Sequence, residues 1–144
     1  MSILKMPGVT ARASAVRAAA GAYDATGNTL PVPSYDTVSF WPDYTPGASG
    51  GAFALIIEVS RDGTTWYPAP IADSALAESG TTATVTNYGM AVKWPVTAGT
   101  SLLNLAPLRV DVRDVMCVRC RAAEYGVTAT PGTLAVTETA TRPL

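Results

Sequence analysis

Hydrophobic and polar residues alternate along most of the chain after residue 34. The clearest case is Ala52–Ser60, where every second residue from Phe53 to Val59 is a large apolar side chain and Glu58 lies between two of them. A period of two predicts a strand with one face in the core. The segment Arg61–Thr64 (RDGT) follows at once and predicts a hairpin turn, because Asp-Gly tolerates positive φ.

The same alternation predicts strands at Tyr35–Trp41, Thr65–Pro68, Thr81–Asn87, Gly89–Val96, Leu108–Arg113, Val115–Ala123 and Thr133–Thr139. Glycine and proline turn signals separate them, and no helix long enough for a βαβ unit alternates with them. Roughly seven to nine short strands with regular turns predict an all-β fold, an antiparallel sandwich of the jelly-roll or immunoglobulin-like type.

The first 34 residues follow a different pattern. The stretch Thr10–Ala20 (TARASAVRAAA) has good helix formers and an N-cap candidate, yet it has few apolar anchors and could equally be extended. Pro31 and Pro33 keep the chain extended after it. We therefore expect an N-terminal arm over residues 1–34, extended or with a short helix, followed by a sandwich domain over residues 35–144.

The net charge and the distribution of charged residues limit the kinds of molecule that the chain is expected to bind. The chain has 144 residues, a formal net charge of −1 and only 15% charged residues, so nucleic-acid binding is not expected. No apolar run is long enough to span a bilayer, and no membrane partner is expected. Residues 1–23 contain Lys5, Arg12 and Arg17 and no acid, whereas the rest has seven basic and eleven acidic residues. A basic arm on an acidic body is compatible with an assembly contact, and the alternative is a chance distribution of three charges.

The residues offer little for catalysis. The chain has no histidine, which removes the commonest general base and metal ligand. The acids have structural explanations: Asp62 belongs to its turn, and Glu58 and Asp111 lie beside basic neighbours on strands. Cys117 and Cys120 form a CxxC inside a strand, where they would point to opposite faces about 10 Å apart, too far for a disulfide. No catalytic, cofactor-binding or metal-binding residue is therefore expected, and no cofactor.

Arginines and aromatic residues remain as candidates for binding. Arg109 and Arg113 would share one strand face, and Arg119 and Arg121 a face of the next strand. If those strands pair, an arginine-rich stripe results, which is either a solvated face with cross-strand charge pairs or a protein contact. Trp66 is expected in the core, whereas the roles of Trp41 and Trp94 stay open.

Three segments resemble those of a known family. Phe53–Trp66 (FALIIEVSRDGTTW) and the pair Val118–Arg121 (VRCR) and Pro131–Thr137 (PGTLAVT) are similar to segments of small β-sandwich virion proteins of tailed bacteriophages, over about residues 50–140. The resemblance implies a head decoration or cement protein, or a fibre, with an arm that laces subunits together. It carries no catalytic motif.

The leading hypothesis is a non-enzymatic virion protein that decorates or cements the outside of a tailed-phage capsid. Its partner would be the major capsid protein or another virion protein, and it would form a homo-oligomer, with a trimer as the expected form. The expected interface residues are Lys5, Arg12, Arg17, Arg109, Arg113, Arg119 and Arg121. The alternatives are a glycan-binding or host-adhesion module of a phage tail or cell surface, and a carboxylate-based hydrolase.

Overall fold

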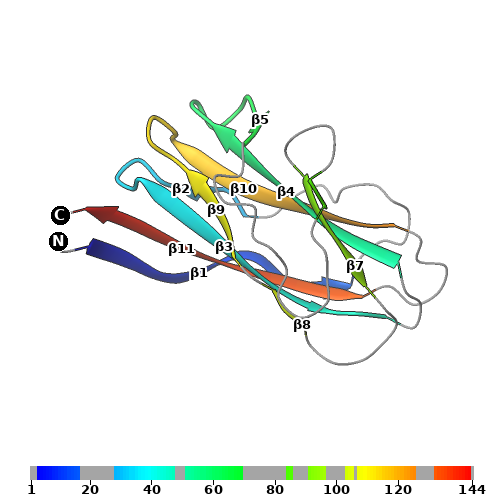
Figure 1. Ribbon diagram of the computed structural model, residues 1–144. Helices are drawn as coiled ribbons and strands as arrows, with labels where there is room; N and C mark the ends of the chain where they lie inside the picture. The colour runs from blue at the N-terminus through cyan, green and yellow to red at the C-terminus, as the bar shows by residue number, and fades with distance from the viewer. Residues whose placement is uncertain are drawn as a thin grey trace.

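The computed structural model describes residues 3–16, 28–47, 51–69, 84–85, 91–96, 103–105, 107–125 and 132–143 (Figure 1). These residues form eleven strands and contain no helix. The strands are β1 (Ile3–Val16), β2 (Leu30–Pro31), β3 (Thr37–Thr45), β4 (Gly51–Ser60), β5 (Tyr67–Pro68), β6 (Thr84–Val85), β7 (Ala91–Val96), β8 (Leu103–Asn104), β9 (Leu108–Asp111), β10 (Cys117–Tyr125) and β11 (Thr133–Pro143). No described helix could therefore cross a membrane.

The strands form two antiparallel sheets that face each other as two layers (Figure 1). Sheet A has the order β1-β11-β3-β8, and β9 also pairs with β3. Sheet B has the order β2-β10-β4-β7-β6, and β5 also pairs with β4. The predicted antiparallel β-sandwich is confirmed.

The order in which the chain visits the sheets distinguishes the two sandwich types. It alternates from β1 in sheet A to β2 in sheet B and β3 in sheet A, runs through β4 and β7 in sheet B, then continues with β9 in A, β10 in B and β11 in A. The first strand thus lies beside the last, and β2 beside β10. This arrangement of two interleaved Greek keys is a jelly roll.

Two corners that carry the chain between the sheets are built alike. In the corner between β2 and β3, the amide of Tyr35 donates to the carbonyl of Val32 over 3.1 Å. In the corner between β9 and β10, the amide of Val115 donates to the carbonyl of Val112, also over 3.1 Å. Val32 and Val112 are both buried, so each corner places one valine in the core.

The corners also bind each other. The amide of Val32 donates to the carbonyl of Met116 over 2.8 Å, and the amide of Val112 donates to the carbonyl of Asp36 over 2.9 Å. Each corner thus gives one hydrogen bond to the other and receives one. This reciprocal pair, called the corner clasp below, joins the two sheets at one end of the sandwich.

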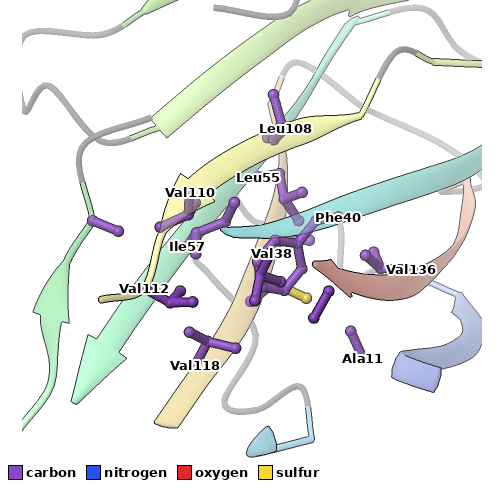
Figure 2. Packing of buried hydrophobic residues seen from close by; sticks show 14 of the residues in the cluster. Ala11, Val38, Phe40, Leu55, Ile57, Leu108, Val110, Val112, Val118 and Val136 are labelled. Atoms are coloured by element: carbon purple, nitrogen blue, oxygen red, sulfur yellow. The ribbon is translucent and has the colours of Figure 1, made fainter. Parts of the chain in front are cut away.

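The core lies between the inner faces of the sheets. Every second residue of β3, β9 and β11 points inward from sheet A, and every second residue of β4 and β10 from sheet B, as the period of two requires. Figure 2 shows part of this packing, with Phe40 and Val38 of sheet A close to Ile57 and Leu55 of sheet B. The buried apolar set also includes Tyr44, Leu108, Val110, Val118, Cys120, Ala122, Leu134, Val136 and Ala140.

The predicted hairpin turn after β4 is held by two short side chains. The Asp62 carboxylate accepts hydrogen bonds from the amides of Thr64 and Thr65 at 2.8 and 2.7 Å. These amides, Thr65 first, hold the pKa of Asp62 well below its usual range. The Ser60 hydroxyl accepts from the amide of Gly63, whose φ is 76°, a conformation that favours glycine.

Two expectations about strands change. The strand predicted over Tyr35–Trp41 continues through Pro42 to Thr45. The ladder along that edge of β3 ends at Phe40 with β9 and resumes at Asp43 with β8, so the proline lies where a donor is not needed.

The N-terminal segment is extended rather than helical over the residues that the structure describes. Residues 3–16 form β1 and pair with β11 from Ile3 opposite Pro143 to Val16 opposite Thr133. Cross-strand pairing outweighs the modest helix propensity of this stretch. The division of the chain at residue 34 stays a prediction, and part of the expected arm is a strand of sheet A.

Candidate interaction surface

Arg119 and Arg121 lie on the outer face of sheet B and are bound to one carboxylate. Arg119 is directly opposite Glu58 in the register, and its Nε donates to Glu58 Oε2 over 2.6 Å. Arg121 lies diagonally opposite, and its Nη1 donates to Glu58 Oε1 over 3.1 Å. The side chain of Glu58 is 9% exposed, so both guanidinium groups cover it.

Trp66 completes this cluster. The guanidinium of Arg119 lies 4.0 Å from the centroid of the Trp66 ring, within the range of a cation–π contact. The expectation that Trp66 packs in the core is wrong, because Trp66 is only partly buried and its ring lies against Arg119 on the outer face of sheet B. We call Glu58, Arg119, Arg121 and Trp66 the arginine cluster. Its charges are engaged within the chain.

Arg109 and Arg113 lie elsewhere. Arg109 is in β9, opposite Ser39 of β3, and is exposed on the outer face of sheet A. Arg113 follows β9 in the corner, and its Nε donates to both carboxylate oxygens of Asp111 at 3.0 Å. The Arg113 side chain, followed by its backbone amide, lowers the pKa of Asp111 to about 2.

The arginines therefore do not form one stripe. The stripe required β9 and β10 to pair, but β9 pairs with β3 in sheet A, and β10 pairs with β4 and β2 in sheet B. The corner after β9 carries the chain to the other layer, and the hydrophobic period contains no signal for that crossing.

The basic residues of the N-terminal segment are also separated. Arg12 is buried, at 6% exposure, and donates to the carbonyls of Ala13 and Leu134. Lys5 lies in β1 opposite Thr141. Arg17 lies outside the described residues. A role for these three residues in partner contacts stays a prediction.

The structure adds one surface that the sequence left open, the outer face of β3 and β11. Trp41 lies there, 43% exposed, and its Nε1 donates to Thr139 Oγ1 over 2.9 Å. Small polar residues alternate along both strands around it, namely Thr37, Ser39, Asp43 and Thr45 in β3 and Thr133, Thr137, Thr139 and Thr141 in β11. We call this set with Trp41 the threonine face. In the sequence, the alternation of small polar residues in each of the two strands was the signal that could have indicated this face.

One buried acid was also missed. Glu138 is fully buried on the inner side of β11, between Val136 and Ala140 and opposite Phe40 of β3. Neither of its carboxylate oxygens has a hydrogen-bond partner within the described structure. Loss of hydration raises its pKa to about 8, so the side chain is mostly protonated at neutral pH.

The two buried carboxylates among the described residues lie in different sheets. The two buried carboxylates are Glu58, on the outer face of sheet B, and Glu138, on the inner face of sheet A. Within the described ranges, no group of three or more metal-ligating side chains is present. Cys117 and Cys120 both lie in β10 and are not joined by a disulfide, with Cys120 buried and Cys117 partly buried, which confirms the interpretation of the CxxC as two strand cysteines.

Comparisons with known proteins show the fold. No protein-family model matches the chain, and no curated protein sequence matches it. The chain is similar to the SPBc2 prophage-derived protein YomS, with a TM-score of 0.51 and 11% identity over 99% of this chain and 96% of that one. At this identity the similarity establishes a shared fold.

Two further solved structures are more distant. A chain of Bacillus endospore appendages, which are disulfide-linked pili, has a TM-score of 0.41 and 15% identity over 99% of this chain and 89% of that one. A chain of infectious bursal disease virus, Gx strain, has a TM-score of 0.43 and 15% identity. The match covers 98% of this chain but 32% of the viral one. Both scores are too low to show a common fold.

Proposed function

We propose that this chain is a structural protein of a tailed-phage virion that decorates or cements the outside of the capsid as a symmetric oligomer, with a trimer as the expected form. The observation that carries this is the jelly-roll topology of the described residues, together with a fold similarity to a prophage-derived protein that covers 99% of this chain. The fold hosts many functions, so particle association is the property to measure.

The described surface supports binding rather than catalysis. Arg109 on the outer face of sheet A and Arg113 in the corner after β9 are both exposed and available to an acidic partner surface, because even paired arginines are common at protein interfaces. Arg119 and Arg121 are bound to Glu58, and Arg12 is buried. These three arginines therefore contribute mainly to contacts within the fold. Partner contacts are therefore expected to depend most on the exposed arginines.

The edge of sheet A formed by β1 is partly closed to pairing with a strand of another chain. β1 has three irregularities in its register with β11. On the same strand, the Asn28 amide donates to the Ala11 carbonyl over 2.7 Å, and the Asn28 side chain donates to the Thr10 carbonyl over 2.9 Å. Bulges and such contacts are how natural edges avoid unwanted strand addition. Assembly is thus expected to use side-chain surfaces more than added strands.

Particles produced by the genome that encodes the chain provide the test. Purified particles are analysed by mass spectrometry, and the isolated chain by light scattering for its oligomeric state. The chain is expected in the particles, with a number of copies per particle that matches a class of symmetry axes of the capsid. Particles stripped of the chain should take up added wild-type protein and bind the Arg113→Glu variant less. Absence of the chain from purified particles would end this assignment.

The glycan-binding alternative has weaker support as the main role. An adhesion module would gather several exposed aromatic rings in one groove or loop cluster. Among the residues described, Trp41 and Tyr67 are exposed, and they belong to different sheets. We therefore favour virion assembly over adhesion as the main function.

A further inference from the structure

Trp41 is exposed but fixed in place. It is the only large apolar side chain that the described part of the threonine face exposes, because Tyr67 belongs to sheet B, Met116 to the corner before β10, and Val9 lies in β1 opposite Glu138. Its indole reaches from β3 across to β11, where Nε1 donates to Thr139 Oγ1. The ring therefore leans over the neighbouring strand, and its orientation is set before any ligand binds.

The groups around the ring are hydrogen-bonding groups. Thr137 lies directly opposite Trp41 in the register, and Ser39 and Asp43 lie two residues away on the same face of β3. Neighbours at that spacing are about 7 Å apart along a strand, which brackets the ring on both sides. Asp43 is opposite Ala135, whose short side chain leaves its carboxylate accessible.

The hydroxyls keep hydrogen-bonding capacity. Thr139 Oγ1 accepts the indole N–H, so its own hydrogen can be donated elsewhere. Ser39 and Thr137 can each donate and accept, and Asp43 can accept from two hydroxyl groups at once when ionised. A ligand for this surface thus needs one apolar face and a rim of hydroxyl groups.

We propose that Trp41 with Ser39, Asp43, Thr137 and Thr139 is a saccharide-binding platform. The C–H groups on one face of a pyranose ring carry slight positive charge and suit the negative face of the indole. The equatorial hydroxyl groups of the sugar then bind Asp43 and the neighbouring hydroxyls. One stacking ring makes binding to a single site weak, and a symmetric oligomer would strengthen it by presenting several sites.

A protein hot spot is the competing use of an exposed tryptophan. The centre of such an interface is apolar and depleted in serine and in charged residues. Around Trp41 the described neighbours are serine, threonine and aspartate instead. This composition suits a polyhydroxylated ligand better than a protein core. The saccharide site does not depend on the proposed virion role, because a chain absent from particles could still bind a sugar.

A glycan array probed with the full chain, followed by titration of the best oligosaccharide, tests the platform. The ¹⁵N-labelled indole resonance of Trp41 reports binding directly. Trp41→Ala is expected to weaken binding about tenfold or more, the loss of one stacking contact, whereas Trp41→Tyr retains part of it. Tyr67→Ala is the matched control, since Tyr67 is an exposed aromatic residue in the other sheet, and it is expected to bind as wild type.

Circular dichroism and thermal unfolding of each variant separate loss of binding from loss of fold. Asp43→Asn should weaken binding in a correctly folded chain and leave the unfolding temperature unchanged. No binding across the array, or equal binding by wild type and a folded Trp41→Ala, overturns the platform. Loss of particle uptake in Trp41→Ala without any glycan binding also overturns it, and identifies Trp41 as a protein contact.

Discussion

At the scale of residues, two charge pairs in this chain have the same chemistry and different surroundings. Glu58 is 9% exposed beneath Arg119 and Arg121, whose side chains are 19% and 30% exposed. The pair Arg113–Asp111 is 68% and 47% exposed. Partial burial strengthens the first interaction and makes its loss expensive, whereas water screens the second. The arginine cluster should therefore matter to stability and the exposed pair should not.

Glu58→Gln should lower the free energy of unfolding by about 1–3 kcal/mol, because it leaves two partly buried guanidinium groups without a charged partner. Urea denaturation at neutral pH measures this. Asp111→Asn is the matched control and should change the midpoint far less, since exposed pairs contribute little. Equal effects of the two substitutions would show that the arginine cluster is a solvated ion pair like the other.

At the scale of elements, β1 approaches β11 closely at one glycine. A Cβ atom on Gly8 would lie 2.9 Å from Thr137 Cγ2, closer than such atoms normally come. The position lies between Met6, which pairs with Ala140, and Val9, which pairs with Glu138, where the register shifts. The missing side chain of Gly8 therefore lets the irregular strand stay against its neighbour.

Gly8→Ala should destabilise the wild-type chain by about 1 kcal/mol, because the overpacking outweighs the entropy gained in the unfolded state. Thr137→Ser removes the methyl group that would clash. In that background Gly8→Ala should cost little or become slightly stabilising, so a double-mutant cycle should give a coupling energy of about 1 kcal/mol. Additive effects in denaturant titrations would mean that the contact with Thr137 does not restrict Gly8.

The individual strands also show which parts of the fold the sequence predicts. Strands β4 and β11 were predictable because apolar residues alternate from Phe53 to Val59 and from Leu134 onward. Extending the second alternation by two residues places Glu138 in the core, so that buried acid was within reach of the pattern. Alternation gives the face of a residue within its own strand and contains nothing about which strand lies beside it.

The corner clasp explains why the sequence did not predict that β9 and β10 lie in different sheets. Its two halves have matching backbone hydrogen bonds but share little sequence, since LPVPSYD and VDVRDVM agree at few positions. Backbone amides and carbonyls make the contacts, so side-chain identity hardly records them. Without the corners, β9 and β10 look like a hairpin, and their arginines look like one stripe. The threonine face was missed for a related reason, since it needs β3 to lie beside β11.

At the scale of the whole molecule, stability should vary with pH in an unusual way. The chain has no histidine, so few side chains ordinarily titrate between pH 5 and pH 8. Glu138 is the exception, because burial raises its pKa from 4.5 in the unfolded chain to about 8 in the folded one. Its nearest basic neighbour along the strand pair, Arg12, donates to backbone carbonyls.

The sign of the effect follows from proton uptake. Between pH 4.5 and pH 8 the folded state holds a proton on Glu138 that the unfolded state has released, so raising the pH favours unfolding. Below about pH 4 the lowered pKa values of Asp62 and Asp111 act in the opposite direction, since protonation removes contacts made only in the folded state. Stability should therefore be highest near pH 4.5.

Thermal and urea unfolding measured from pH 4 to pH 9 should show this maximum, with a loss on the order of 3–5 kcal/mol between pH 5 and pH 8. Glu138→Gln removes the titrating group and keeps its shape, so its stability should be nearly constant over that interval. Asp43→Asn, at an exposed carboxylate, should follow the wild-type curve. A wild-type profile that is flat from pH 5 to pH 8 would mean that Glu138 ionises in place, with water or a charged group reaching it inside the sandwich.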